Sequence, residues 1–218
     1  MKTSSQLRLE ACNDLKGQWS SVVVVALIYM AIEFVVTNAL SIWYYIEMMN
    51  HKGPIYLSKY LMFLVPFITI PLIYGYQVLF LENMRGKEFS FDTLFSGFKK
   101  YTPVFKTMIL SGSKVFLYGL LLIVPGVIKC LDYAFVVYIM KDKGVYMHEA
   151  LYLSEQLMKG NRMRLFKLYL SFIGWGLLVL VTLGIAALWV GPYIEATRVR
   201  FYNDLLSDSE KCTEPIEC

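Results

Sequence analysis

The chain has 218 residues, of which 57% are hydrophobic and 17% are charged, and its formal net charge is +4. Soluble globular domains are roughly 45–50% apolar and about 25% charged, so this composition argues against a water-soluble protein. The mean hydropathy of +0.51 agrees. The length leaves room for a single integral membrane domain, residues 1–218, and little else.

The first long apolar run extends from Trp19 to Met49. It exceeds the roughly 20 residues that cross about 30 Å of hydrocarbon, and it is too long for the apolar part of a signal peptide. Residues 1–17 carry scattered charges of both signs instead of a short basic segment. We therefore expect this run to be a retained membrane span.

The second apolar run, Leu57 to Leu81, contains Pro66 and Pro71. A proline inside a span is tolerated where neighbouring helices satisfy the carbonyl group that it frees. We therefore expect the crossing to continue through both prolines, with a kink at Pro71.

The third apolar region, residues 104–140, is too long for one helix across the bilayer and short for two. We place its turn near residues 118–119. A competing turn at residues 125–126 would move Lys129 and Asp132 towards the outer surface. The choice between the two positions stays open at this point.

The last apolar region runs from Met163 to Tyr202, and its natural turn is residues 182–184, where Gly184 can take the positive φ that ends a helix. The four regions together predict an all-α membrane protein. We expect about six transmembrane helices arranged as a bundle of three helical hairpins.

Basic residues give an independent test, because short cytoplasmic loops are enriched in Lys and Arg. With six spans the outer loops keep only Lys52 and Lys59, while Lys114 and Lys129 fall within spans and the other Lys and Arg lie on the inner side. This distribution predicts cytoplasmic N and C termini. A five-span alternative, with one long kinked helix through residues 104–140, would place the basic cluster of residues 141–167 outside.

Each return helix is expected to carry a kink at a proline: Pro71, Pro125 or Pro192. Residues 71–80 and 192–201 share Pro, Ile, Val and Phe at equal spacing, which suggests an internal repeat of the kind found in transporters. Chance similarity between two apolar helices explains this match equally well.

Two inner segments, near 89–100 and 145–159, have the pattern of amphipathic helices, and residues 204–218 form a short polar tail. Such helices lie in the membrane interface or pack against the cytoplasmic ends of the spans. We favour packing.

Four ionisable residues inside the predicted spans, Glu33, Lys129, Asp132 and Glu195, form a candidate buried polar cluster. Each charge costs about 2.5–3.5 kcal/mol or more at the centre of a span, so each should turn inward and pair. Lys129 can meet Asp132 on one helix face or bridge to Glu33 or Glu195. We favour a structural role for the cluster over a proton-coupled site.

The sequence lacks the motifs of common enzymes. His51 and His148 are isolated, so we expect no metal site, and neither a phosphate-binding loop nor a serine-hydrolase motif occurs. We therefore predict no catalytic residues and no cofactor. The net charge follows from the topology and requires no nucleic acid partner.

The second half of the chain carries a series of recognisable motifs. They are PGVIK at 125–129, MKG at 158–160, LSFIGW at 170–175, TLGI at 182–185, LW at 188–189, PY at 192–193 and FY at 201–202. In these motifs the chain resembles a bacterial integral membrane family, domain of unknown function 975. Ala186 stands where that family's turn has a glycine. The resemblance implies an all-helical bacterial membrane protein and brings no established substrate, cofactor or catalytic residue.

The sequence therefore favours a non-enzymatic protein of the bacterial cytoplasmic (inner) membrane that acts through lipid contacts, a protein partner at its cytoplasmic face, or a homo-oligomer. The alternative is a small permease or ion-coupled carrier that uses the buried charges. Paired charges in a dry, packed structure would favour the first function. A water-filled cavity lined by the four charged residues would favour the second.

Overall fold

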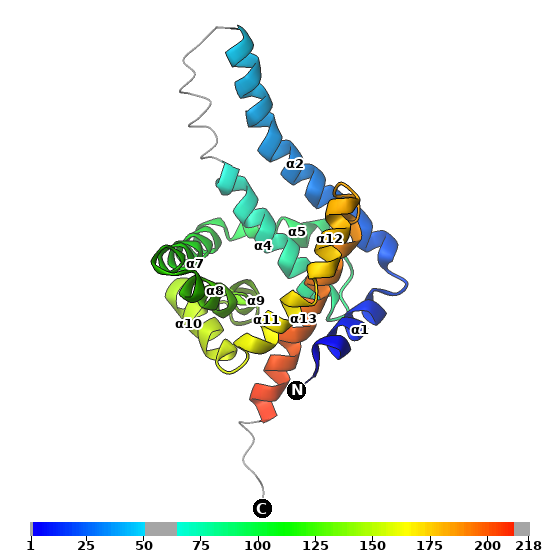
Figure 1. Ribbon diagram of the computed structural model, residues 1–218, viewed down its shortest axis with the longest axis vertical. Helices are drawn as coiled ribbons and strands as arrows, with labels where there is room; N and C mark the ends of the chain where they lie inside the picture. Colours follow the sequence, from blue (N-terminus) through cyan, green and yellow to red (C-terminus); the bar gives the residue numbers. More distant parts are fainter. Residues whose placement is uncertain (1, 51–64, 212–218) are drawn as a thin grey trace, which may run out of the picture.

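Helices form all the regular secondary structure in residues 2–50 and 65–211, the part of the chain that the computed structural model describes (Figure 1). In chain order they are α1 (Ser4–Leu15), α2 (Trp19–Asn50), α4 (Val65–Asn83), α5 (Phe91–Leu94), α6 (Ser96–Lys99), α7 (Tyr101–Leu121), α8 (Ile123–Asp132), α9 (Val136–Lys143), α10 (Met147–Met158), α11 (Arg162–Leu170), α12 (Ile173–Val181) and α13 (Ala187–Lys211). The all-α prediction is confirmed.

Among the described residues, five helical stretches are long and apolar enough to cross a membrane. They are Trp19–Asn38, Val65–Asn83, Tyr101–Leu121, Ile123–Lys143 and Arg162–Val181. They indicate a multi-pass membrane protein. The sequence predicts about six such stretches. The remaining region, residues 187–202, lies in α13, where Glu195, Arg198 and Arg200 make the helix much less apolar.

The turn between α7 and α8 lies at Leu122, between the two positions that the sequence offers. Leu122 is extended, with φ −160° and ψ 145°. On either side of the turn α7 and α8 approach closely, since a Cβ added to Gly126 would lie 2.6 Å from the Cα of Gly119. Pro125 stands in the first turn of α8, where its missing N–H costs no helical hydrogen bond. The prediction that Pro125 kinks a helix part-way along is therefore wrong, whereas Pro71 and Pro192 do lie inside helices.

The fourth stretch is interrupted between α8 and α9, and the fifth between α11 and α12. At residues 133–135 some backbone hydrogen bonds join residues three apart instead of four. Ala134 N donates to the Leu131 carbonyl, and Val136 N donates to the Tyr133 carbonyl. The expected turn after α12 is present, and Gly184 takes a φ of +92°.

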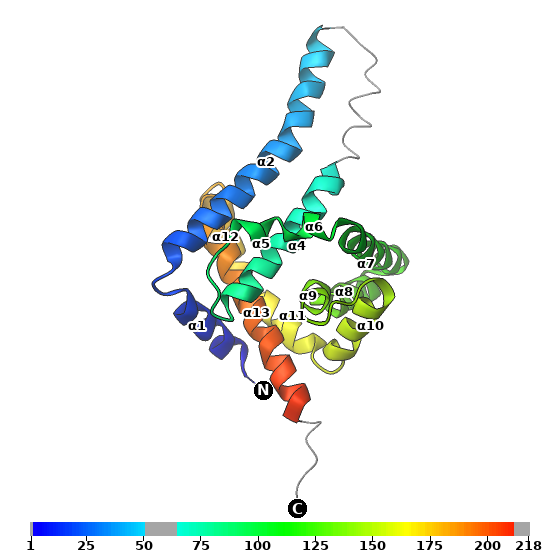
Figure 2. The ribbon, with the colours of Figure 1, turned by 180° about the vertical axis from the view of Figure 1, so that it is seen from behind.

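The helices do not share one direction. In Figure 1, α7, α8 and α9 are seen nearly along their axes, whereas α2, α4 and α13 lie across the view. The view from behind agrees (Figure 2). The α7–α8 hairpin therefore crosses α4 and α13 at a steep angle. The start of α1 lies beside the last part of α13, and these two helices are in contact.

The segment near 89–100 packs against α4 at backbone distance. A Cβ on Gly75 would lie 1.7 Å from the carbonyl oxygen of Leu94, and a Cβ on Gly97 would lie 2.1 Å from that of Pro71. Leu94 and Gly97 are buried, while Phe91 is 58% exposed. The segment therefore packs against α4, and packing is the alternative that we favour from the sequence.

The segment near 145–159 forms α10, which packs against α7 and α9. Its buried residues are Ala150, Leu151, Ser154 and Met158. Leu153, by contrast, is only partly buried against the core.

The predicted polar tail begins inside a helix. Residues 204–211 continue α13, and Asp204 is buried and accepts a 2.7 Å hydrogen bond from Arg164. Residues 212–218 lie outside the described part of the chain.

Substitution of Gly75 by alanine should test the contact between α4 and the segment near 89–100. The Leu94 carbonyl would have to move, and overpacking of this kind costs about 1–3 kcal/mol or more. We expect a lower thermal unfolding midpoint for the purified protein in detergent and a lower abundance in membranes. Gly174→Ala is the matched control, because nothing lies within 4 Å of its added Cβ. Equal midpoints for both variants would show that the close approach is unnecessary.

Candidate functional site

The four intramembrane charged residues that the sequence singles out lie at three separate places. Lys129 and Asp132 meet, with 3.6 Å between Nζ and Oδ2. Glu195 pairs with Arg198 instead, and Glu33 contacts a tyrosine. The single cluster that the sequence suggests is therefore not formed.

Asp132 is the most completely buried of these charges, with a side chain that is 0% exposed. It is the last residue of α8, and Arg162 at the start of α11 holds both of its oxygens, with Nε 2.5 Å from Oδ1 and Nη2 3.1 Å from Oδ2. The hydroxyl of Ser154 in α10 donates to the Asp132 backbone carbonyl at 2.6 Å. These contacts join α8, α10 and α11 at one point.

Lys129 extends this network to a second carboxylate. Its Nζ lies 2.7 Å from Oε1 of Glu155 in α10, and the rings of Tyr118 and Tyr133 flank it at 5.5 and 5.6 Å. The hydrogen bond from Lys129 holds the pKa of the Glu155 carboxyl below its usual range. Together with Arg162 and Asp132, two cations face two carboxylates, so the network is formally neutral.

Glu195 and Arg198 form a second neutral unit, one helical turn apart in α13. Arg198 Nη1 lies 2.7 Å from Glu195 Oε1, and the Tyr138 hydroxyl donates to Oε2 at 3.2 Å. Arg198 Nη2 donates to the carbonyl of Ala134 at 2.8 Å. That carbonyl belongs to the break between α8 and α9, so Arg198 satisfies a backbone group that the interrupted helix leaves open.

Glu33 has no cation within ion-pair distance among the described residues. The Tyr29 hydroxyl donates to its carboxylate at 3.4 Å, and the Tyr29 ring stacks on Tyr76 with 4.3 Å between centroids. Glu195 interacts electrostatically with both tyrosines. Glu33 is therefore connected to the α13 pair only through aromatic rings.

Sequence reasoning missed the partners Glu155, Arg162 and Arg198. Glu155 lies in the segment expected to pack as an amphipathic helix against the ends of the spans, and Arg162 lies just before the last apolar region. The sequence did not indicate which intramembrane charges these two residues would pair with. For Arg198 a signal existed, because it stands three residues after Glu195 and such pairs meet on one helix face.

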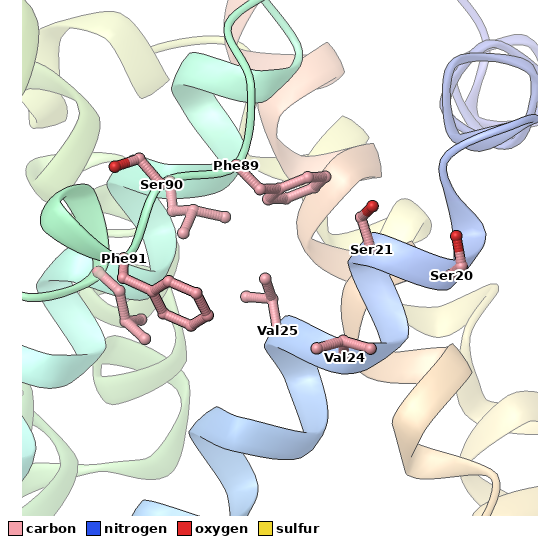
Figure 3. A pocket seen from close by; sticks show the side chains of 9 residues that line it. Ser20, Ser21, Val24, Val25, Phe89, Ser90 and Phe91 are labelled. Atoms are coloured by element: carbon pink, nitrogen blue, oxygen red, sulfur yellow. The ribbon is translucent and has the colours of Figure 1, made fainter.

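A cleft lies where α2 begins and α4 ends. Its apolar part, about 380 Å³ in volume, is lined mainly by Val24, Val25, Leu79, Phe89 and Phe91 (Figure 3). An adjoining polar part of about 390 Å³ is lined by residues that include Gln18, Asn83, Lys87 and Glu88. The two parts share Ser21 and Phe89, and we call them together the α2–α4 cleft.

The described residues contain no group of three or more His, Cys, Asp or Glu side chains that could hold a metal ion. Within the same residues, Cys12 and Cys130 are free thiols.

Removing one partner of the Asp132 ion pairs should destabilise the protein strongly. A buried charge left without its partner costs about 3–5 kcal/mol, so Asp132→Asn and Arg162→Met should each lower the free energy of unfolding by an amount in that range. The double variant should cost less than the sum of the two. Denaturant titration of the purified protein in detergent measures all three values.

The control for this experiment is Lys99→Ala, which removes an ion pair whose side chains are 63% and 77% exposed. Exposed pairs contribute only about 0–1 kcal/mol. A cost for Asp132→Asn no larger than that of the control would contradict a central structural role for Asp132.

Similarity to known proteins is found in the second half of the chain. No curated protein and no solved structure shows a significant match. A family model does match, and its range contains Asp132, Glu155, Arg162 and the Glu195–Arg198 pair. Residues 108–209 match the family described as "Protein of unknown function (DUF975)", which confirms the resemblance seen in the sequence motifs.

Proposed function

We propose that the protein is a non-enzymatic integral protein of a bacterial cytoplasmic membrane that acts by binding phospholipid in the α2–α4 cleft. The observation that carries this proposal is the division of the cleft into an apolar part and an adjoining polar part. A phospholipid has the same division, between acyl chains and headgroup. The cleft also lies at the ends of two candidate spans, which is the depth at which headgroups meet hydrocarbon.

Selectivity in such a cleft comes from its polar part. Lipid tails are as apolar as the side chains that would contact them, so the apolar part contributes shape and little transfer free energy. Lys87 and Glu88 carry opposite charges, and Lys87 is 67% exposed although it pairs with Glu82. A zwitterionic headgroup, with a phosphate and an ammonium group, matches these charges best.

The paired charges favour this function over a permease or ion-coupled carrier. A carrier of the kind expected from the sequence needs Glu33, Lys129, Asp132 and Glu195 around one cavity. Three of the four have cationic or anionic partners within 4 Å. The cavity between α4, α7 and α13 is lined by Arg198 but by none of the four.

The proposed topology has about six crossings, with the first part of α13 as the last and both termini in the cytoplasm. Two contacts between α1 and α13 support termini on one side: Lys2 N donates to Asp204 Oδ2 at 3.3 Å, and Arg200 pairs with Asp14. The tight α7–α8 hairpin adds two crossings or none, so it does not change the side on which the chain ends. The excess of Lys and Arg selects the cytoplasmic side.

Reporter fusions test this topology. Alkaline phosphatase, which is active only outside the cytoplasm, should be inactive when fused at either terminus and active when fused after Gly184 in a truncated chain. A green fluorescent protein should give the opposite pattern. An active phosphatase at one terminus alone would require an odd number of crossings and would overturn the proposal.

Lipid retention tests the cleft. The full-length protein, purified in mild detergent, should retain phosphatidylethanolamine in native mass spectra in preference to phosphatidylglycerol. Ser21→Trp should fill the cleft where its two parts meet and reduce the retained lipid several-fold. Lys87→Gln should reduce it by a smaller factor, because one charge-assisted hydrogen bond is removed.

Leu27→Trp is the matched control, since Leu27 lies in α2, is 52% exposed and does not line the cleft. Unchanged thermal midpoints would show that all three variants are folded. Equal lipid retention by Ser21→Trp and Leu27→Trp would refute the cleft as a lipid site, and a preference for phosphatidylglycerol would refute the zwitterionic headgroup.

A further inference from the structure

A second cavity lies beside the break between α8 and α9. Its volume is about 550 Å³, and its walls come from α4, α7, α8, the break, α9, α11 and α13. We call it the central cavity. This volume lies within the range of about 300–1,000 Å³ that small-molecule sites occupy.

One wall of the central cavity is mainly apolar and belongs to α7. Met108, Ser111, Gly112, Val115 and Phe116 line it at successive spacings of three, one, three and one residues, so they occupy one face of that helix. The Ser111 hydroxyl is the polar group of this wall, and it donates to the Met108 carbonyl. The wall suits a hydrocarbon chain laid along α7.

Another part of the lining carries hydrogen-bond donors. Tyr133, Tyr169 and Arg198 belong to it, and Nε of Arg198 is buried without a hydrogen-bond partner among the described residues. Arg198 is bound to Glu195, to the carbonyl of Ala134 and to the Tyr169 side chain, so its guanidinium is held in place before any ligand arrives. A fixed guanidinium beside phenol hydroxyls is a site for oxygen acceptors.

The charge around this wall does not balance. Four cations, Lys114, Lys129, Arg162 and Arg198, lie near Tyr133 or pair with its neighbours, against the carboxylates of Asp132, Glu155 and Glu195. Lys114 is the cation in excess: it interacts electrostatically with Glu155, which already pairs with Lys129, and no carboxylate lies within ion-pair distance of it in the part of the chain that the structure describes.

Lys114 also lies in a costly position. It stands within α7, one of the candidate spans, with its Nζ 6.0 Å from the centroid of the Tyr133 ring. An unpaired lysine inside a span is strongly unfavourable. Lys114 does not itself line the central cavity, but Tyr133 does, so an anionic group bound beside Tyr133 would lower the cost of this charge, whereas an uncharged ligand would not.

We propose that the central cavity binds a single-chain anionic amphiphile, a long-chain carboxylate. The carboxylate lies at the wall formed by Arg198, Tyr133 and Tyr169, with Lys114 supplying the balancing charge, and the hydrocarbon chain lies along the apolar face of α7. This site is separate from the α2–α4 cleft and does not depend on the function proposed for that cleft.

Binding of palmitate to the full-length protein in detergent tests the proposal, with hexadecanol as the uncharged ligand of equal chain length. Palmitate should bind saturably with one site per chain. Hexadecanol should bind at least about tenfold more weakly, a factor that corresponds to about 1.4 kcal/mol. Equal binding of the two ligands would overturn the assignment of an anion site.

Variants locate the binding. Lys114→Met should weaken palmitate binding about tenfold without breaking any ion pair, and Gly112→Leu should abolish it by filling the cavity, since nothing lies within 4 Å of an added Cβ there. The matched controls are Lys106→Met, an exposed lysine of the same helix, and Gly174→Leu in α12. Both should bind palmitate as the unchanged protein does.

Competition separates the possible sources of the anion. Phosphatidylglycerol should displace palmitate poorly, and Ser21→Trp should leave palmitate binding intact even if it abolishes phospholipid retention. Displacement by phosphatidylglycerol at equal concentration would assign the cavity to a phospholipid instead. Equal loss of palmitate binding in Lys114→Met and Lys106→Met would show non-specific attraction to basic residues and would also refute the proposal.

Discussion

A carboxylate inside an apolar helical protein is stable only when cations and hydrogen-bond donors surround it, and the surroundings of Asp132 determine how α8, α10 and α11 meet. Arg162 must come from the start of α11 to reach both carboxylate oxygens. Lys129, one turn earlier in α8, links the pair to Glu155 in α10. Because Asp132 is also where α8 ends, the same contacts place the break before α9. Arg198 then reaches the free carbonyl at that break and attaches α13.

Backbone contact between small residues is the second constraint, and it acts on the other half of the protein. Pro71 and Gly75 in α4 meet Gly97 and Leu94 at distances that leave no room for a side chain. In a membrane, where apolar burial between helices yields little, such close approach supplies the dispersion and dipole contacts that hold helices together. The same contact holds in place the segment that forms one side of the α2–α4 cleft, since Phe91 and Leu94 of this segment line the apolar part of the cleft.

Sequence patterns predicted what depends on local chemistry. Where the structure describes them, the long apolar runs became helices. Gly184 took the positive φ that its turn requires, and Lys129 met Asp132 three residues away. The sequence patterns failed where contacts between several helices determine the structure. Glu155 belongs to a segment predicted as an amphipathic helix, and Arg162 precedes the last apolar region, so the sequence did not show that both would reach the charges of α8. Pro125 looked like a kink, yet the turn at Leu122 places it in the first turn of α8, where a proline costs nothing.

A similar distinction separates the charges that hold the helices together from Lys114. Asp132, Glu155 and Glu195 each have a cation at 2.5–2.7 Å, so these pairs are already satisfied and gain little from a ligand. Lys114 has no such partner in the described residues, and it faces the ring that the paired Lys129 also contacts. A stable apolar protein can keep a charge of this kind only if something else compensates it. An anionic amphiphile drawn from the surrounding bilayer supplies that compensation at the place where the protein leaves both a cavity and a buried donor without a partner, Nε of Arg198.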